Sequence, residues 1–327
     1  MTSVDPILVT GANGFLGRAL VARLLSSGAS VRATDLGAAG SASGAAYRQA
    51  DITRPEELPP LMENVTVAIH AAGLAHVMSP DAQSAGRFEL VNETGTASIA
   101  AAAAAAGVRH LVLISSVSVY GPSTRGMCDE NTPCNPDGPY AISKHRAEQQ
   151  AIDIAGRSGM ALTTLRLATL YGEGDPGNVG RLMRAVDGRR FLWIGDGSNR
   201  KSLLYSEDAA RACLAVAERP ASGISVYNVS APPCTMREIV SAIAGALGKS
   251  VPAWHVPAAV ALSAAKFAGI FSFSRSGRLG RIYGTLQKWL AEDCYATEKF
   301  CTAFNFQTKV SLQEGLKREA GWYKAGR

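Results

Sequence analysis

Hydrophobic and polar positions alternate in two rhythms along the first half of the chain. Short β-branched runs predict strands at 5–10, 30–35, 46–52, 65–73, 109–121 and 160–172. The segments between them have helical spacing of apolar residues and cover 14–28, about 80–106 and about 139–156. Strand–helix alternation of this kind predicts an α/β fold with a parallel, doubly wound sheet. Ligands of such a sheet bind beyond the carboxyl ends of its strands.

The pattern becomes irregular after residue 172, where glycines and short elements dominate, and the C-terminal third is mostly helical. We therefore predict two parts. Residues 1–172 form the larger, sheet-containing part, and 173–327 form a smaller, mixed α/β part that binds substrate. The chain is expected to cross between them.

Composition and charge narrow the class of protein. The chain has 327 residues, 47% of them hydrophobic and 18% charged, with a formal net charge of +6. Lys and Arg are spread along the chain rather than gathered in one block, which argues against a nucleic-acid partner. A mild basic excess suits an anionic substrate.

Neither a metal site nor a membrane span is expected. The six cysteines form no CxxC pair and have no histidine at zinc spacing, so free thiols in a reducing cytoplasm are predicted. No signal peptide is visible before the first strand-like run. The longest apolar segment, 256–273, is interrupted by Lys266. It is interpreted as a packed or lid helix, with a peripheral membrane contact as the alternative.

A glycine-rich turn, "TGANGFLG", joins the first strand to the first helix. Its glycines, Gly11, Gly14 and Gly17, are spaced GxxGxxG. The turn lets the backbone approach a pyrophosphate, and the N–H groups of the following helix point at the anion. The sequence therefore predicts dinucleotide binding, with Asn13, Phe15 and Leu16 among the residues of the cofactor site.

The ends of the next strands complete the predicted cofactor site. Asp35 follows Gly17 by 18 residues, where a carboxylate accepts hydrogen bonds from the adenosine ribose and repels a 2′-phosphate. NAD is thus favoured, while Arg18 and Arg32 leave NADP as an alternative. A turn-forming role for Asp35 is the competing interpretation. The remaining predicted cofactor contacts follow the third and fourth strands, at Asp51, Ile52, Ala71, Ala72 and Gly73.

Tyr140 and Lys144 stand one helical turn apart in "GPYAISKHRAE". A free tyrosine has a pKa near 10, and a neighbouring cation favours the phenolate, so this pair suits general acid–base catalysis. Three serines, Ser115, Ser116 and Ser118, stand where the fifth strand ends. One of them is expected to orient a substrate hydroxyl.

These motifs together resemble the extended short-chain dehydrogenase/reductase family, and more narrowly its nucleotide-sugar epimerase and dehydratase branch. The resemblance rests on TGxxGxxG, "SSVSVYG" and YxxxK, and extends over nearly the whole chain. It implies a Rossmann domain, an NAD(P) cofactor, and a catalytic set of Ser116, Tyr140 and Lys144. It also implies a cofactor-site role for Asn92, for which helix packing is the alternative.

The resemblance leaves more than one reaction open. Dehydratases of this branch carry an Asp–Glu pair where this chain has Val117 and Ser118, so 4,6-dehydration is disfavoured. We expect an NAD-dependent 4-epimerase of a UDP-hexose or UDP-N-acetylhexosamine. One alternative is a 4-ketoreductase of a UDP-4-keto-6-deoxy-N-acetylhexosamine in surface polysaccharide synthesis. The others are a dihydroflavonol-type or hydroxysteroid-type reductase and a non-catalytic dinucleotide-binding sensor.

The resemblance also implies a UDP-sugar site in the second part and a homodimer. The predicted substrate residues are Ser116, Thr169, Asn178, Lys201 and Arg281, with Arg200 and Arg278 as alternatives for the diphosphate. The family usually has arginine at position 201. His76 is interpreted as structural, with the sugar as its alternative partner. The dimer seam is expected on the helices 80–106 and 139–156.

Overall fold

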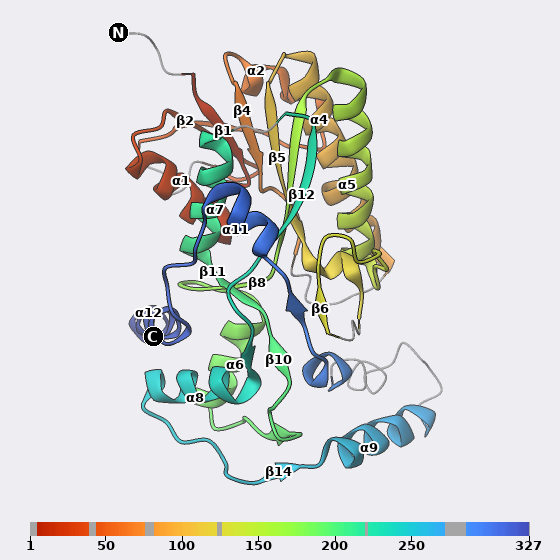
Figure 1. The fold of residues 1–327 in the computed structure, drawn as a ribbon, viewed down its shortest axis with the longest axis vertical. Coiled ribbons are helices and arrows are strands. Elements are labelled where there is room, and N and C mark those ends of the chain that lie inside the picture. The colour runs from red at the N-terminus through yellow and green to blue at the C-terminus, as the bar shows by residue number, and fades with distance from the viewer. Residues whose placement is uncertain are drawn as a thin grey trace.

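A seven-stranded sheet forms the centre of the first part (Figure 1). The structure is a computed structural model that describes residues 5–38, 44–75, 82–122, 126–219, 222–271 and 286–326. The strands, in chain order, are β1 (Ile7–Thr10), β2 (Val31–Asp35), β3 (Ala46–Gln49), β4 (Val67–His70), β5 (His110–Ser116), β7 (Ala161–Leu167) and β12 (Ile224–Val229). Their spatial order is β12-β7-β5-β4-β1-β2-β3, and every pairing is parallel. The predicted doubly wound α/β fold is confirmed.

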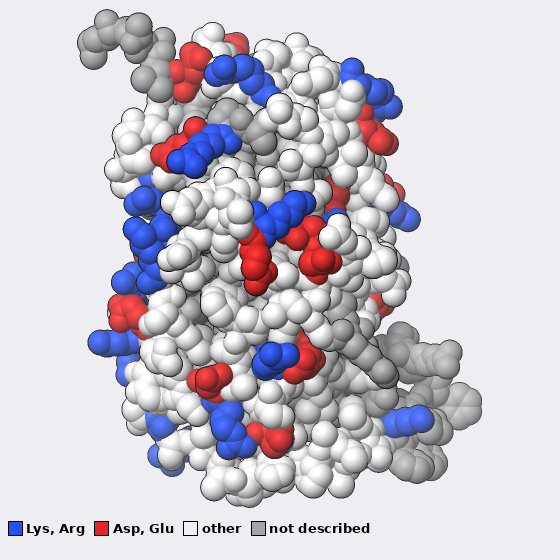
Figure 2. All heavy atoms as spheres, in the orientation of Figure 1, with Lys and Arg blue, Asp and Glu red and all other residues white. Residues whose placement is uncertain are grey.

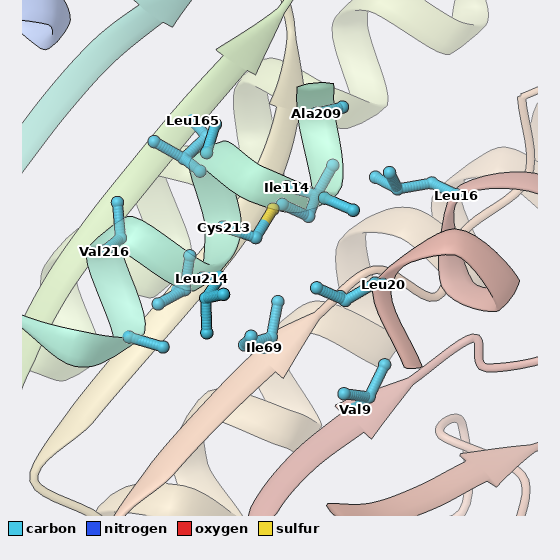
Figure 3. Close-up of a cluster of buried hydrophobic side chains, with 14 of the residues drawn as sticks. Val9, Leu16, Leu20, Ile69, Ile114, Leu165, Ala209, Cys213, Leu214 and Val216 are labelled. Atoms are coloured by element: carbon cyan, nitrogen blue, oxygen red, sulfur yellow. The ribbon is translucent and has the colours of Figure 1, made fainter. Parts of the chain in front are cut away.

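Helices cover both faces of the sheet and build a hydrophobic core on each. On one face lie α1 (Phe15–Ser26) and α7 (Ser206–Glu218), and Figure 3 shows Leu20 and Cys213 from these helices in one cluster with Ile69 of β4. The other face is covered by α2 (Pro59–Met62), α4 (Gly95–Ala105) and α5 (Pro139–Ser158). Full burial of such aliphatic side chains stabilises the fold by roughly 1.5–3 kcal/mol each.

Three predicted elements differ in detail from the observed ones. The long helix is divided into α3 (Ala82–Phe88), a π-helical segment η2 (Glu89–Thr94) and α4. The strand expected to continue to 121 ends at Ser116 and turns into a 3-10 helix, η3 (Val117–Tyr120). The sixth predicted strand is two strands, because β8 (Thr169–Tyr171) leaves the sheet to pair with β11 (Leu203–Tyr205).

The second part packs around its own core. Its main helices are α6 (Asn178–Asp187), α8 (Met236–Leu247) and α12 (Leu312–Ala325). Short strand pairs join the remaining segments: β9 (Trp193–Ile194) with β14 (His255–Val256), β10 (Arg200–Lys201) with β13 (Cys234–Thr235), and β6 (Met127–Cys128) with β15 (Cys294–Tyr295). The other elements are η1 (Pro55–Glu57), α9 (Ala258–Phe271) and α11 (Glu298–Phe304).

The chain contributes to the sheet again after entering the second part. Helix α7 packs on α1, β12 extends the sheet beside β7, and Phe300 of α11 belongs to the same core as α1. Residues beyond 172 therefore complete the first part. Within the described ranges, no helix is long and apolar enough to span a bilayer.

Candidate active site

The glycine-rich turn between β1 and α1 has no room for a side chain at Gly11 or at Gly17. Gly11 has φ +71°, and a Cβ there would lie 2.6 Å from the backbone of Ala72. A Cβ on Gly17 would lie 1.9 Å from the carbonyl oxygen of Gly11. Gly14 is the N-cap residue of α1 and has no side chain. The first N–H groups of the helix, those of Phe15 and Leu16, therefore have no side-chain acceptor. This cradle fits the pyrophosphate of a dinucleotide.

Asp35 lies at the carboxyl end of β2 and faces the glycine turn. Its carboxylate accepts hydrogen bonds from the backbone N–H of Asn13 at 2.9 Å and of Leu36 at 2.8 Å. The two candidate NADP cations differ in position. Arg32 donates to the carbonyl oxygens of residues 61 and 63, toward the amino end of the strand, whereas Arg18 donates to the carbonyl of Asn13 at 2.7 Å. Only Arg18 adjoins the turn.

Other predicted cofactor residues make contacts that fix the segments after β2 and β3. The side-chain amide of Asn13 donates to the carbonyl of Ala38 at 3.0 Å and to the Tyr47 hydroxyl at 3.2 Å. Asp51 accepts from both the N–H and the hydroxyl of Thr53, which closes a turn after β3. Ile52 is buried and packs against Gly95 of α4.

A buried histidine that the sequence analysis did not single out fixes the loop after β4. His70 contacts the Thr10 hydroxyl through Nδ1 at 2.7 Å and the Thr96 hydroxyl through Nε2 at 3.0 Å. Thr10 in turn accepts the N–H of Ala72 at 3.2 Å. Burial, and secondarily the charge of Lys144, lowers the pKa of His70 to about 3. The neutral imidazole of His70 thus positions the loop 71–73 that follows β4.

Asn92 braces the same loop against α5. It accepts the N–H of Leu74 at 2.7 Å and donates to the Leu74 carbonyl and to the Ser143 hydroxyl, each at 3.0 Å. A Cβ on Gly73 would lie 2.9 Å from Asn92 Oδ1 and 3.3 Å from Lys144 Nζ. The π-helical turn of η2 carries Asn92 into this buried position.

The predicted catalytic side chains meet where β5 ends. Ser116 accepts the N–H of Ser118 at 3.2 Å, and its hydroxyl is close enough to the phenol of Tyr140 to act on the pKa of that group. Lys144 Nζ donates to the carbonyl of Ile114 at 3.0 Å, which holds the amine beside the same strand. Strand β5 and helix α5 therefore bring a serine, a tyrosine and a lysine together at the carboxyl edge of the sheet.

Burial dominates the protonation of this set. It raises the pKa of Tyr140 above its usual value, and the hydrogen bond from Ser116 acts in the opposite direction. Burial also lowers the pKa of Lys144 to about 8, against the opposing effect of Glu148. The YxxxK spacing predicts that Lys144 lowers the pKa of Tyr140. In the folded chain burial of the phenol is the largest effect, and it acts in the opposite direction.

A buried ion pair behind the catalytic set was missed by the sequence analysis. Arg166 of β7 donates to Glu148 of α5 through Nη2 at 2.7 Å and through Nε at 3.0 Å. Ser115 donates to the same carboxylate at 2.5 Å, and Arg166 also donates to the Tyr120 hydroxyl at 3.0 Å. The signal in the sequence was the position of Glu148, one helical turn beyond Lys144.

The predicted substrate residues other than Ser116 lie at the end of the first part and in the second part. Thr169 is half-buried in β8, and Asn178 begins α6, where it accepts a hydrogen bond from Arg181 at 2.7 Å. Lys201 Nζ is paired with the Asp293 carboxylate at 2.6 Å. Arg281, with Arg278 and His76, lies outside the described residues.

The fold and the glycine turn are those of a dinucleotide-dependent enzyme, and the serine, tyrosine and lysine grouped at the end of β5 are residue types that can move a proton at an alcohol or carbonyl oxygen. The chain matches the model of the "NAD dependent epimerase/dehydratase family" over residues 7–230. It therefore belongs to this family, within the extended short-chain dehydrogenases/reductases, and NAD as the predicted cofactor is confirmed.

Three proteins illustrate the similarity. A UDP-glucose 4-epimerase of Vibrio cholerae is 31% identical over 320 residues, covering 96% of this chain and 94% of the relative. An N-acetyl-alpha-D-glucosaminyl-diphospho-ditrans,octacis-undecaprenol 4-epimerase of Escherichia coli O157:H7 is 30% identical over 241 residues, covering 70% and 69%. The solved structure of MoeE5 in complex with UDP-glucuronic acid and NAD has a TM-score of 0.78 at 24% identity, covers 98% and 100%, and shares the fold.

Proposed function

We propose that the protein is an NAD-dependent 4-epimerase of a UDP-hexose or UDP-N-acetylhexosamine. The observation that carries this proposal is that Ser116 adjoins Tyr140, with Lys144 on the same helix and held against β5. The relative from Vibrio cholerae, similar over nearly the full length, is named as an epimerase of this kind. Val117 and Ser118 supply no acid next to Ser116 for dehydration.

In this proposal, Tyr140 takes the proton of the sugar 4-hydroxyl. Ser116 donates to the phenolate and orients the hydroxyl, and Lys144 holds positive charge beside them. Bound NAD supplies a hydride acceptor and, when oxidised, a cationic ring. Because burial alone raises the pKa of Tyr140, the phenolate depends on positive charge close to it.

The remaining site assignments belong to the same proposal. The glycine turn with Asn13, Phe15 and Leu16 would hold the pyrophosphate, and Asp35 would accept hydrogen bonds from the adenosine ribose. Asp51, Ile52 and the Ala71–Gly73 loop would line the adenine and ribose side. Asn92 would act indirectly, since three of its hydrogen-bonding positions already hold Leu74 and Ser143.

The substrate side is the least constrained part of this assignment. Thr169, Asn178, Lys201 and Arg281 would contact the nucleotide or its diphosphate. The pairing of Lys201 with Asp293 means that a diphosphate must share or displace that partner.

The decisive experiment is incubation of the purified protein with UDP-glucose or UDP-N-acetylglucosamine without added cofactor, followed by NMR of the product. A C4 epimer is expected. Tyr140→Phe should abolish turnover and retain NAD. The matched control is Tyr227→Phe, whose ring packs on Phe300 in the core and which should stay active. Inertness of the wild type, together with NAD(P)H oxidation on a 4-keto sugar, would replace the epimerase by the ketoreductase.

We further infer a cytoplasmic homodimer that serves glycan synthesis. Leu90 of η2 and Ile142 of α5 are large apolar side chains exposed on two neighbouring elements, which suits a helical dimer seam. The Escherichia coli relative is named for a polyprenyl-diphosphate sugar, which supports the glycan role. Light scattering of the wild type and of Ile142→Glu tests the dimer: the wild type should have twice the mass of the variant.

A further inference from the structure

The positive charge of the chain is concentrated in one acid-free stretch. Between Glu238 and Glu292, residues 239–291 contain no Asp or Glu. They contain six basic residues, Lys249, Lys266, Arg275, Arg278, Arg281 and Lys288. The rest of the chain has 27 basic and 27 acidic residues, so its formal charge is balanced. The formal excess of positive charge therefore lies in this stretch of the sequence, within which Lys249 is paired with Asp187 at 3.5 Å.

The helix at the centre of this stretch, α9, is apolar on nearly all sides. It has 14 residues and Lys266 is its one charged side chain. Such a helix is normally buried in a core, yet Val260 is 57% exposed and Ala259, Ala264 and Lys266 are also exposed. Figure 1 shows α9 at the end of the molecule away from the sheet.

An exposed tryptophan stands beside this helix. Trp254 is 64% exposed and precedes α9 by one short strand, β14. β14 pairs with β9, and the N–H of Gly195 donates to the carbonyl of Val256 at 2.9 Å, which fixes the entry to α9 on the body of the second part. Tryptophan is amphipathic and favours the boundary between water and lipid.

We propose that Trp254 and the exposed side chains of α9 form a docking surface for an anionic lipid bilayer. The helix would lie in the headgroup region, since it is too short to cross a membrane. The occupant follows from charge: a lipid surface with negative headgroups complements the acid-free stretch, whereas a second copy of this chain would present the same positive charge. In the face drawn in Figure 2, basic colour lies at the end of the molecule where Figure 1 draws α9.

The test is co-sedimentation of the full-length protein with vesicles. Binding is expected to vesicles containing phosphatidylcholine with about one third phosphatidylglycerol, and it should weaken as salt is added. Vesicles of phosphatidylcholine alone should bind far less. Equal binding to both compositions, or no binding to either, overturns the proposal.

Variants assign the binding to this surface. Lys266→Glu should lower the partition coefficient by roughly 30-fold, because each basic residue at an anionic surface is worth about fivefold and reversal counts twice. Val260→Glu should lower it by at least about fivefold. The control Trp322→Ala removes a tryptophan that is 55% exposed on α12 and should bind as the wild type does. Wild-type binding by Lys266→Glu refutes the assignment.

Two measurements separate this inference from the others. If Val260→Glu turns a dimer into a monomer and leaves vesicle binding unchanged, the surface faces a second copy and the proposal is wrong. Turnover of UDP-sugar in solution should be the same for Lys266→Glu and wild type. Docking does not rest on the proposed reaction, so an inactive protein that still binds vesicles would refute the epimerase alone.

Discussion

Arg166→Met should destabilise the protein by about 3–5 kcal/mol, the usual cost of removing one partner of a buried ion pair. The side chains of Arg166 and Glu148 are 8% and 2% exposed, so water cannot replace the lost partner. The substitution removes three charge-assisted bonds to Glu148 and the bond to Tyr120. Glu148 would keep only the Ser115 hydroxyl among the hydrogen bonds described above.

Urea unfolding measures this cost as a lower transition midpoint at an unchanged slope. The matched control is Arg200→Met, because the Arg200–Glu292 pair is 48% and 39% exposed and should contribute less than about 1 kcal/mol. The double variant Glu148→Leu/Arg166→Met leaves no unpaired charge and should be more stable than Arg166→Met alone. If Arg166→Met costs as little as Arg200→Met, the interpretation of this pair as a buried support is wrong.

Three further predictions concern the cofactor edge. Folded Lys144 loses its proton near pH 8, before the same lysine of the unfolded chain does. The free energy of unfolding of the wild type, relative to that of Lys144→Met, should therefore rise by about 2 kcal/mol from pH 8 to about 9.5, as measured by urea unfolding. Folded His70 stays neutral down to about pH 3, whereas the unfolded chain takes up a proton below pH 6.5. The free energy of unfolding should therefore fall by about 1.4 kcal/mol for each pH unit below 6.5, and the His70→Gln variant should lack this slope in an acid titration. Gly17→Ala should lose bound NAD, read by absorbance of the purified protein, because its methyl would meet the Gly11 carbonyl.

The sequence predicts those features that depend on residues close to one another in the chain. The strand–helix alternation and the glycine turn depend on neighbours in sequence, and both appear where predicted. The one-turn spacing of Tyr140 and Lys144 likewise placed both side chains on α5 beside β5. These parts of the fold and site could be predicted because hydrophobic periodicity and helix geometry set them.

The features that the sequence does not predict depend on packing between residues that are far apart in the chain. The burial that raises the pKa of Tyr140 depends on the surrounding elements rather than on Lys144 alone. Lys201 is paired with Asp293, which lies 92 residues away in the chain. Glu148 was visible one turn after Lys144, but its partner Arg166 is on a different element. No spacing rule connects such residues.

The return of the chain to form β12 has a consequence for dissecting the protein. β7 lies between β5 and β12, and α7 seals the face that α1 also covers. A fragment ending at residue 172 would present a bare strand edge and an uncovered aliphatic layer, which favours aggregation. The boundary near 172 therefore marks a change of pattern along the chain, and cutting there should yield no autonomously folding nucleotide-binding unit.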